Sequence, residues 1–161
     1  MHFSGIRVSR AFLPILAVFV LVAVCAARTG SETMPPGIRV ELIPEKPLWV
    51  RVTVRSGCDR TVTFLRYKLP WGNRNSILFV AVTPEGTPLE LFMPVDDPIF
   101  DKISLAPGAS VTGDIDLNNF FSRLSLVTKK SDIHLFWAYK SPEELHIPHW
   151  SGGWILLPQQ K

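Results

Sequence analysis

Alternating apolar and polar positions run through this chain and predict a fold built from β-strands. The clearest alternation covers residues 48–54, where leucine and valine side chains take every second position. A second covers residues 111–117 and follows Pro107 and Gly108, which suit the two central positions of a type II turn. A period of two turns one face of a strand toward the core and the other toward water. Both segments are therefore predicted to be strands with one buried face.

Short apolar segments separated by glycine- and proline-rich turns continue this pattern. Residues 77–83 are apolar on both faces, which predicts a central strand, and residues 118–126 form the one predicted helical turn. The remaining predicted strands are residues 61–69, 89–93, 103–105, 133–139 and 154–157. Many short strands with almost no helix indicate an all-β fold. We predict an Ig-like antiparallel β-sandwich of seven to nine strands that occupies residues 37–161.

The first 27 residues have the layout of a segment that directs export. Arg7 and Arg10 precede an apolar run over residues 11–27, and small residues end that run. This layout predicts a secretory signal peptide over residues 1–27, with a polar leader over residues 28–36 after it. The predicted location of the protein is therefore periplasmic or extracellular.

Two alternatives to a cleaved signal peptide remain open. The apolar run reaches the lower limit of a membrane-spanning helix, so an uncleaved anchor would hold the protein in the membrane, facing outside the cytoplasm. Membrane contact would then be confined to residues 11–27. Cys25 would carry a lipid in a bacterial lipoprotein, although the branched Val24 before it fits such processing badly.

Charge and cysteine content narrow the classes of function. The chain has 17 basic and 14 acidic residues, and removal of Arg7 and Arg10 with the signal leaves 15 basic residues, so the mature chain is near neutral. The basic residues are scattered, whereas nucleic-acid binding needs a clustered basic face, so no nucleic-acid partner is predicted. Cys58 is the only cysteine after cleavage; it is interpreted as a small turn residue, with an intermolecular disulfide as the alternative.

Three segments of this chain resemble a known family of secreted proteins. They are residues 50–54 (Val-Arg-Val-Thr-Val), residues 83–91 (Thr-Pro-Glu-Gly-Thr-Pro-Leu-Glu-Leu), and residues 103–117, which run from Ile-Ser-Leu-Ala-Pro-Gly to Gly-Asp-Ile-Asp-Leu. With these segments, residues 48–119 resemble the N-terminal β-sandwich module of the secreted peptidyl-Lys metalloendopeptidases, the deuterolysin-type enzymes. The resemblance implies a β-sandwich and an accessory role. It transfers no catalytic residue, because the His-Glu-x-x-His zinc helix of those enzymes is absent from this sequence.

No set of residues in the sequence predicts a metal site or a cofactor. His146 and His149 are three residues apart, but Pro148 between them disfavours the helical pair that would aim both at one ion. Asp96, Asp97 and Asp101 lack the close spacing and the glycine of a calcium loop, so they are interpreted as solvated.

Nucleophilic side chains likewise lack the sequence context of a catalytic site. Ser110, Ser151 and Cys58 are the candidates, and none lies in a Gly-x-Ser-x-Gly elbow. We therefore predict that the protein is not an enzyme and carries no cofactor.

Aromatic residues with a nearby arginine are the candidate interface. Such residues are typical of protein–protein contacts. The set is Trp49, Trp71, Arg74 and Trp150. In the alternative interpretation, Trp137 and Trp154 fill the core and Trp49 faces a covering loop. The sequence thus predicts an exported non-catalytic module that binds another protein, with protease inhibition or a chaperone-like role as the specific form. A membrane-anchored structural component of the cell envelope is the alternative.

Overall fold

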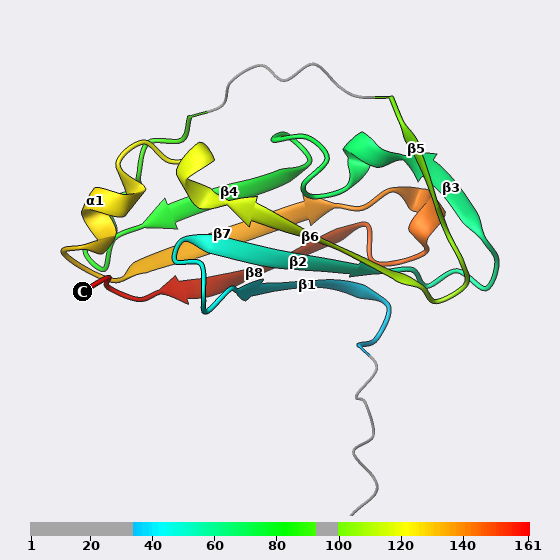
Figure 1. The fold of residues 1–161 in the computed structure, drawn as a ribbon, viewed down its shortest axis with the longest axis horizontal. Helices are drawn as coiled ribbons and strands as arrows, with labels where there is room; N and C mark the ends of the chain where they lie inside the picture. The colour runs from blue at the N-terminus through cyan, green and yellow to red at the C-terminus, as the bar shows by residue number, and fades with distance from the viewer. Residues whose placement is uncertain (1–33, 93–99) are drawn as a thin grey trace, which may run out of the picture. The chain divides into compact units, whose positions relative to one another are not determined.

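Antiparallel strands dominate the part of the chain that the computed structural model describes, residues 34–92 and 100–161 (Figure 1). The strands are β1 (Gly37–Leu42), β2 (Trp49–Arg55), β3 (Val62–Leu65), β4 (Ile77–Val82), β5 (Lys102–Leu105), β6 (Ser110–Asp116), β7 (Ile133–Lys140) and β8 (Trp150–Leu157). The one α-helix among these residues, α1, is a short turn at Leu124–Thr128. The 3₁₀ turns are Arg66–Lys68, Leu117–Asn119 and Glu143–Leu145. The all-β prediction is confirmed.

Two three-stranded sheets and one two-stranded sheet organise these strands. The three-stranded sheets have the orders β1-β2-β6 and β4-β7-β8, and β3 pairs with β5. All of the pairings are antiparallel. In Figure 1, β6, β2 and β1 lie in front of the strands of the β4-β7-β8 sheet. The predicted signal segment, residues 1–27, and residues 28–33 of the polar leader lie outside the described residues.

The inward side chains of the two three-stranded sheets share one hydrophobic cluster. Val50 and Val52 of β2 and Leu135 of β7 are fully buried in it. Phe79 of β4 meets Phe120 edge to face, with ring centroids 5.1 Å apart. The alternation predicted for residues 48–54, 111–117 and 133–139 is confirmed, because the predicted apolar faces point into this cluster or, for Val54 and Val111, into the second cluster described next.

A second hydrophobic cluster lies beside the β3-β5 pair. It includes the buried side chains of Cys58, Phe64, Leu69 and Leu145. Cys58 is 3% exposed, which supports its interpretation as a small turn residue and argues against an intermolecular disulfide. The turn before β6 is as predicted: Gly108 has φ +62°, and the amide of Ala109 donates to the carbonyl of Ala106 over 3.0 Å.

Several predicted strands are wrong in extent or position. Within the described residues, 89–92 form no strand, and only isolated bridges join Val82 to Pro88 and Leu91 to Phe121. Strand β8 begins at Trp150, four residues before its predicted start. Strand β3 ends at Leu65 and a 3₁₀ turn follows it. α1 covers only the end of the predicted helical segment and extends two residues beyond it.

Strand β4 was predicted to be central, and this was wrong. It is the first strand of the order β4-β7-β8, so its ladder neighbour among the described strands is β7 alone. Its second apolar face is not covered by any layer in the described part of the chain, since Leu78 and Val80 are exposed. The outward apolar residues of this strand are therefore part of the exposed surface of the β4-β7-β8 sheet.

Candidate binding surface

The outer face of the β1-β2-β6 sheet is polar, as expected for a sheet with one face in water. Its middle strand contributes Arg51 and Thr53, and β6 places Asp114 and Thr112 opposite them. The guanidinium of Arg51 donates to both carboxylate oxygens of Asp114, over 2.9 and 3.1 Å. Lys46 adds a second cation, with its ammonium 3.7 Å from Asp114. This face is thus covered by cross-strand ion pairs and hydroxyl contacts.

The ion pair predicts how Asp114 titrates. The hydrogen bond from Arg51 lowers the pKa of Asp114 below the usual aspartate value. Because the folded-state pKa is depressed, the pair stabilises the fold at pH values above the unfolded-state pKa. That contribution disappears as the pH falls through the lower, folded-state pKa. In an NMR titration, the Asp114 carboxyl is expected to titrate below the usual value, and Arg51→Ala should raise its pKa. Lys46→Ala is expected to raise it less; an equal effect of both variants would contradict the bidentate pairing.

The outer face of the β4-β7-β8 sheet is apolar. Six large hydrophobic side chains point outward from its strands and are 41–62% exposed. We call this surface the apolar face; its members are Leu78, Val80, Phe136, Trp150, Trp154 and Leu156. Aromatic and aliphatic side chains expose about 100 Å² each at half exposure, so the patch covers about 600 Å². That is the upper end of what a soluble monomer shows to water, and such patches mark interaction sites.

Strand register joins these side chains into one surface. Val80, Phe136 and Trp154 form a row across the three strands, because Val80 pairs with Phe136 and Phe136 pairs with Trp154. The neighbouring row is Leu78, Ala138 and Gly152. Among the described outward residues of these strands, Lys140 carries the only formal charge and none is acidic. The ring of His134 lies 5.9 Å from that of Trp154, at the margin of the face.

Only one of the four residues predicted as the interface lies on the apolar face. Trp150 belongs to it and is exposed, with the ring of His149 against its own at 6.2 Å. Trp49 lies half-buried on the outer face of the other three-stranded sheet, where the ammonium of Lys46 covers its ring at 4.8 Å. These two tryptophans therefore do not share a surface.

Trp71 and Arg74, the other two predicted interface residues, are brought together in a different place. They line one cleft of about 330 Å³ beside Asp114 and Asn119. Arg74 donates to the carbonyl of Asn119 over 3.3 Å. Trp71 is half-buried and packs against both hydrophobic clusters, with its indole over Gly113. Its main role in the structure is therefore packing.

The alternative prediction, that Trp137 and Trp154 fill the core, is right for the first and wrong for the second. Trp137 is partly buried against the core cluster, and a Cβ on Gly153 would lie 3.1 Å from its ring. Trp154 is 62% exposed. The reason is parity: Gly153 pairs with Trp137 and faces inward with it, so the next residue must face outward. Leu78, Val80, Phe136 and Leu156 were not predicted as site residues, although the two-sided hydrophobicity of residues 77–83 was a signal for them.

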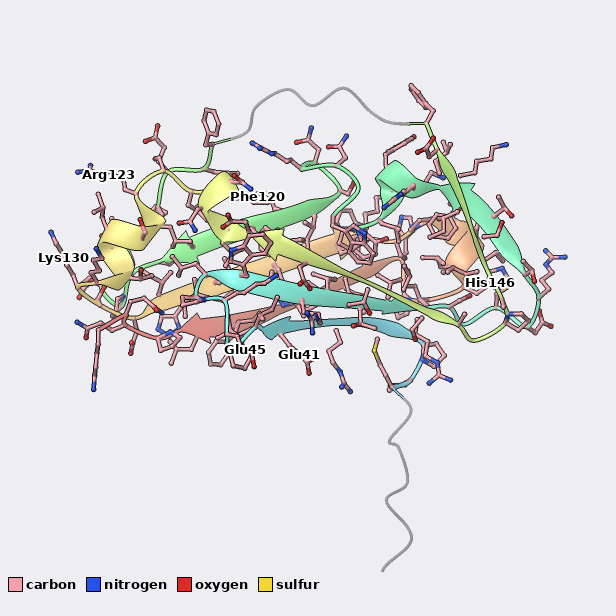
Figure 2. The ribbon with its side chains drawn as sticks, in the orientation of Figure 1. Glu41, Glu45, Phe120, Arg123, Lys130 and His146 are labelled. Carbon is pink, nitrogen blue, oxygen red and sulfur yellow. The ribbon has the colours of Figure 1, made fainter. Side chains whose placement is uncertain are left out.

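The metal-ligating side chains do not gather into a metal site in the described ranges. No group of three or more metal-ligating side chains occurs there. His146 follows the Glu143–Leu145 turn in the left-handed conformation, and Figure 2 shows it at the end of the sheets away from Arg123 and Lys130. Asp96 and Asp97 lie outside the described residues.

A polar cleft of about 660 Å³ lies at the His146 end of the sheets. Lysines, carboxylates and amides line it, and Lys68 pairs with Glu144 over 3.2 Å. The hydrogen bond of the Glu144 backbone amide, and then Lys68, lowers the pKa of Glu144. The hydroxyl of the buried Tyr139 donates to the carbonyl of Lys68 over 3.0 Å and holds this strand end in place. The cleft is lined by two lysines and two glutamates, so these residues leave it with no net formal charge.

Comparison with known proteins adds no assignment. No protein-family model matches the chain, and no curated protein matches it. Within residues 34–92 and 100–161, no helix has the length and hydropathy needed to cross a bilayer. The apolar face is therefore the feature on which a functional argument must rest.

Proposed function

We propose that this chain is an exported, non-catalytic binding module with an Ig-like β-sandwich fold, and that its partner is another protein. One observation carries the proposal: the β4-β7-β8 sheet turns a continuous apolar face to the surface, while the other three-stranded sheet has a polar one. Aromatic side chains and few charges are typical of the buried centre of protein interfaces. The two packed three-stranded sheets support the sandwich component of the proposal.

The apolar face also explains why a protein partner is preferred to a small ligand. A sheet face is broad and shallow, whereas small-molecule sites are concave and enclose most of the ligand. Tryptophan is strongly enriched among residues that dominate binding energy, and the face carries Trp150 and Trp154. The resemblance of residues 48–119 to a metallopeptidase module supports a protease-associated form of this role, as an inhibitor or a chaperone-like module.

Affinity capture with a tagged full-length chain tests the proposal. The bait is the wild-type protein, and captured proteins from the native envelope or secretome are identified by mass spectrometry. We expect Phe136→Glu to reduce the captured partner at least about tenfold, because the substitution places a charge in the centre of the face. Thr53→Glu is the matched control, since Thr53 is central on the outer face of the other sheet.

The outcomes of the capture experiment separate the parts of the proposal. A partner that Phe136→Glu loses and Thr53→Glu retains would support the apolar face as the binding site. Identical capture by all three baits would contradict it. Recovery of a secreted metallopeptidase would support the protease-associated form of the role.

The alternative function is a membrane-anchored structural component of the envelope, and the apolar run over residues 11–27 favours it. The N-terminus of the native protein distinguishes the two. A start near Arg28 supports cleavage and export, while a chain that retains Arg7 and Arg10 supports the anchor.

A further inference from the structure

The apolar face has a relief that its two central rows define. The row Val80-Phe136-Trp154 ends in two large aromatic side chains and forms a ridge. The adjacent row Leu78-Ala138-Gly152 ends in two of the smallest residues, so side-chain size indicates a lower surface over β7 and β8 there. Trp150 is the outward residue of β8 beyond Gly152, so it borders this lower surface on its other side. By the size of its side chains, the face thus has a row of large residues, the ridge, beside a row with small residues, the groove.

Ridge and groove are related in the way that a two-fold axis requires. Consider an axis in the interface plane, along the hydrogen-bonding direction and midway between the two rows. It places β7 over β7 and β8 over β8 of a second copy, with the strand direction reversed. Phe136 then lies over Ala138 of the other copy, and Trp154 lies over Gly152. The reverse contacts form at the same time, which is the self-complementarity of an isologous interface.

The area and charge of the face agree with such an arrangement. Two copies of a patch of about 600 Å² would bury about 1,200 Å² in total, which reaches the range of specific, stable interfaces. Among the described outward residues of the three strands, none is acidic and Lys140 is the only basic one. Like charges therefore do not meet at the centre of the interface. Interfaces between identical subunits are more apolar at their centre than interfaces between transient partners.

We propose that the apolar face binds a second copy of this chain, with the Phe136-Trp154 ridge of each copy in the Ala138-Gly152 groove of the other. This inference rests on the proposed function and names the partner protein. It places the two β4-β7-β8 sheets face to face, about 10 Å apart, as in other packed sheets.

Sedimentation velocity of the purified full-length chain over about 1–100 µM tests the proposal, since this range brackets a micromolar dissociation constant. The wild type is expected to sediment as a dimer. Phe136→Glu should weaken dimerisation about 100-fold or more, because each copy would bury an unpaired carboxylate against Ala138 of the other in an apolar interface. Thr53→Glu, on the other sheet, should remain dimeric. The N-terminal segment is the same in all variants, so its contribution to self-association cancels when the dissociation constants of the variants are compared.

Ala138→Phe is the decisive variant because it adds apolar area while it fills the groove. Ridge-in-groove packing predicts at least about tenfold weaker dimerisation, since the partner's Phe136 loses its place. A tighter association would overturn the proposal and show that the face associates through non-specific hydrophobic contact. Far-UV circular dichroism checks that each variant is folded, and Val80→Lys, on the exposed side of β4, replaces Phe136→Glu if that variant is not.

The remaining outcomes distinguish this proposal from the proposed function. A wild type that is monomeric throughout would overturn the second-copy proposal, as would a dimer that Phe136→Glu leaves intact. Binding of a monomeric wild type to phosphatidylcholine vesicles that Phe136→Glu abolishes would overturn it in favour of a lipid surface, because the loss would place the lipid contact on the apolar face and not on residues 11–27. The proposed function fails on a different result, namely capture of other proteins that does not depend on Phe136.

Discussion

Replacement of Leu124 by alanine is expected to lower the free energy of unfolding by about 2–5 kcal/mol. Leu124 opens α1, is 1% exposed and belongs to the cluster between the two three-stranded sheets. Its removal takes buried methyl groups from that cluster and leaves a cavity that the surrounding strands can fill only in part. Urea denaturation, followed by far-UV circular dichroism, measures the change.

Leu126→Ala is the matched control for this prediction. It removes the same atoms from the same helix, but Leu126 is 55% exposed. The helix propensities of leucine and alanine enter both variants, so the difference between them isolates burial. We expect the control to change the free energy of unfolding by less than about 0.5 kcal/mol. Equal losses in the two variants would contradict the placement of α1 on the core.

Gly113→Ala is expected to destabilise the protein by about 1–3 kcal/mol, although alanine is a small residue. Gly113 lies on the inner side of β6, and a Cβ there would overlap the indole ring of Trp71. The added methyl group must displace Trp71, which packs against both hydrophobic clusters. Chemical denaturation gives the loss of stability, and the indole N–H resonance of Trp71 should shift in the NMR spectrum.

Two comparisons test the cause of this loss. Thr112→Ala changes the preceding residue of the same strand, on its outer face, and should cost less than about 1 kcal/mol. In a Trp71→Leu background, Gly113→Ala should cost less than in the wild type, because the ring that it displaces is gone. Additive losses for the two substitutions would mean that Trp71 does not occupy this space.

Local pattern was sufficient where one set of alternate positions is apolar and the other set is mostly polar. Residues 48–54 and 111–117 have that property, so their strands and their buried faces were both predicted correctly. The turn at Pro107 and Gly108 was predicted as well, because a glycine at positive φ is a local requirement. These features depend on neighbours within a few residues.

The candidate site was harder to predict because both faces of its strands are apolar. In residues 77–83 every position is compatible with burial. The central-strand interpretation implied that both faces of this strand are buried. Of the members of the apolar face, only Trp150 was predicted from sequence as an interface residue, and Trp154 was assigned to the core in the alternative interpretation. Ile133, Leu135 and Tyr139 indicated the buried face of β7, but the outward position of Phe136 gained meaning only beside Val80 and Trp154.

Alternation, turns and the small amount of helix follow from short-range chemistry, and they define an all-β chain before any pairing is known. Whether each tryptophan side chain is buried or exposed does not follow from that chemistry. Trp71 enters the core because Gly113, far along the chain, leaves room for its ring. Trp154 faces outward because Gly153 pairs with Trp137. Strand order and register are long-range properties, and they alone bring six apolar side chains from three strands onto one exposed face.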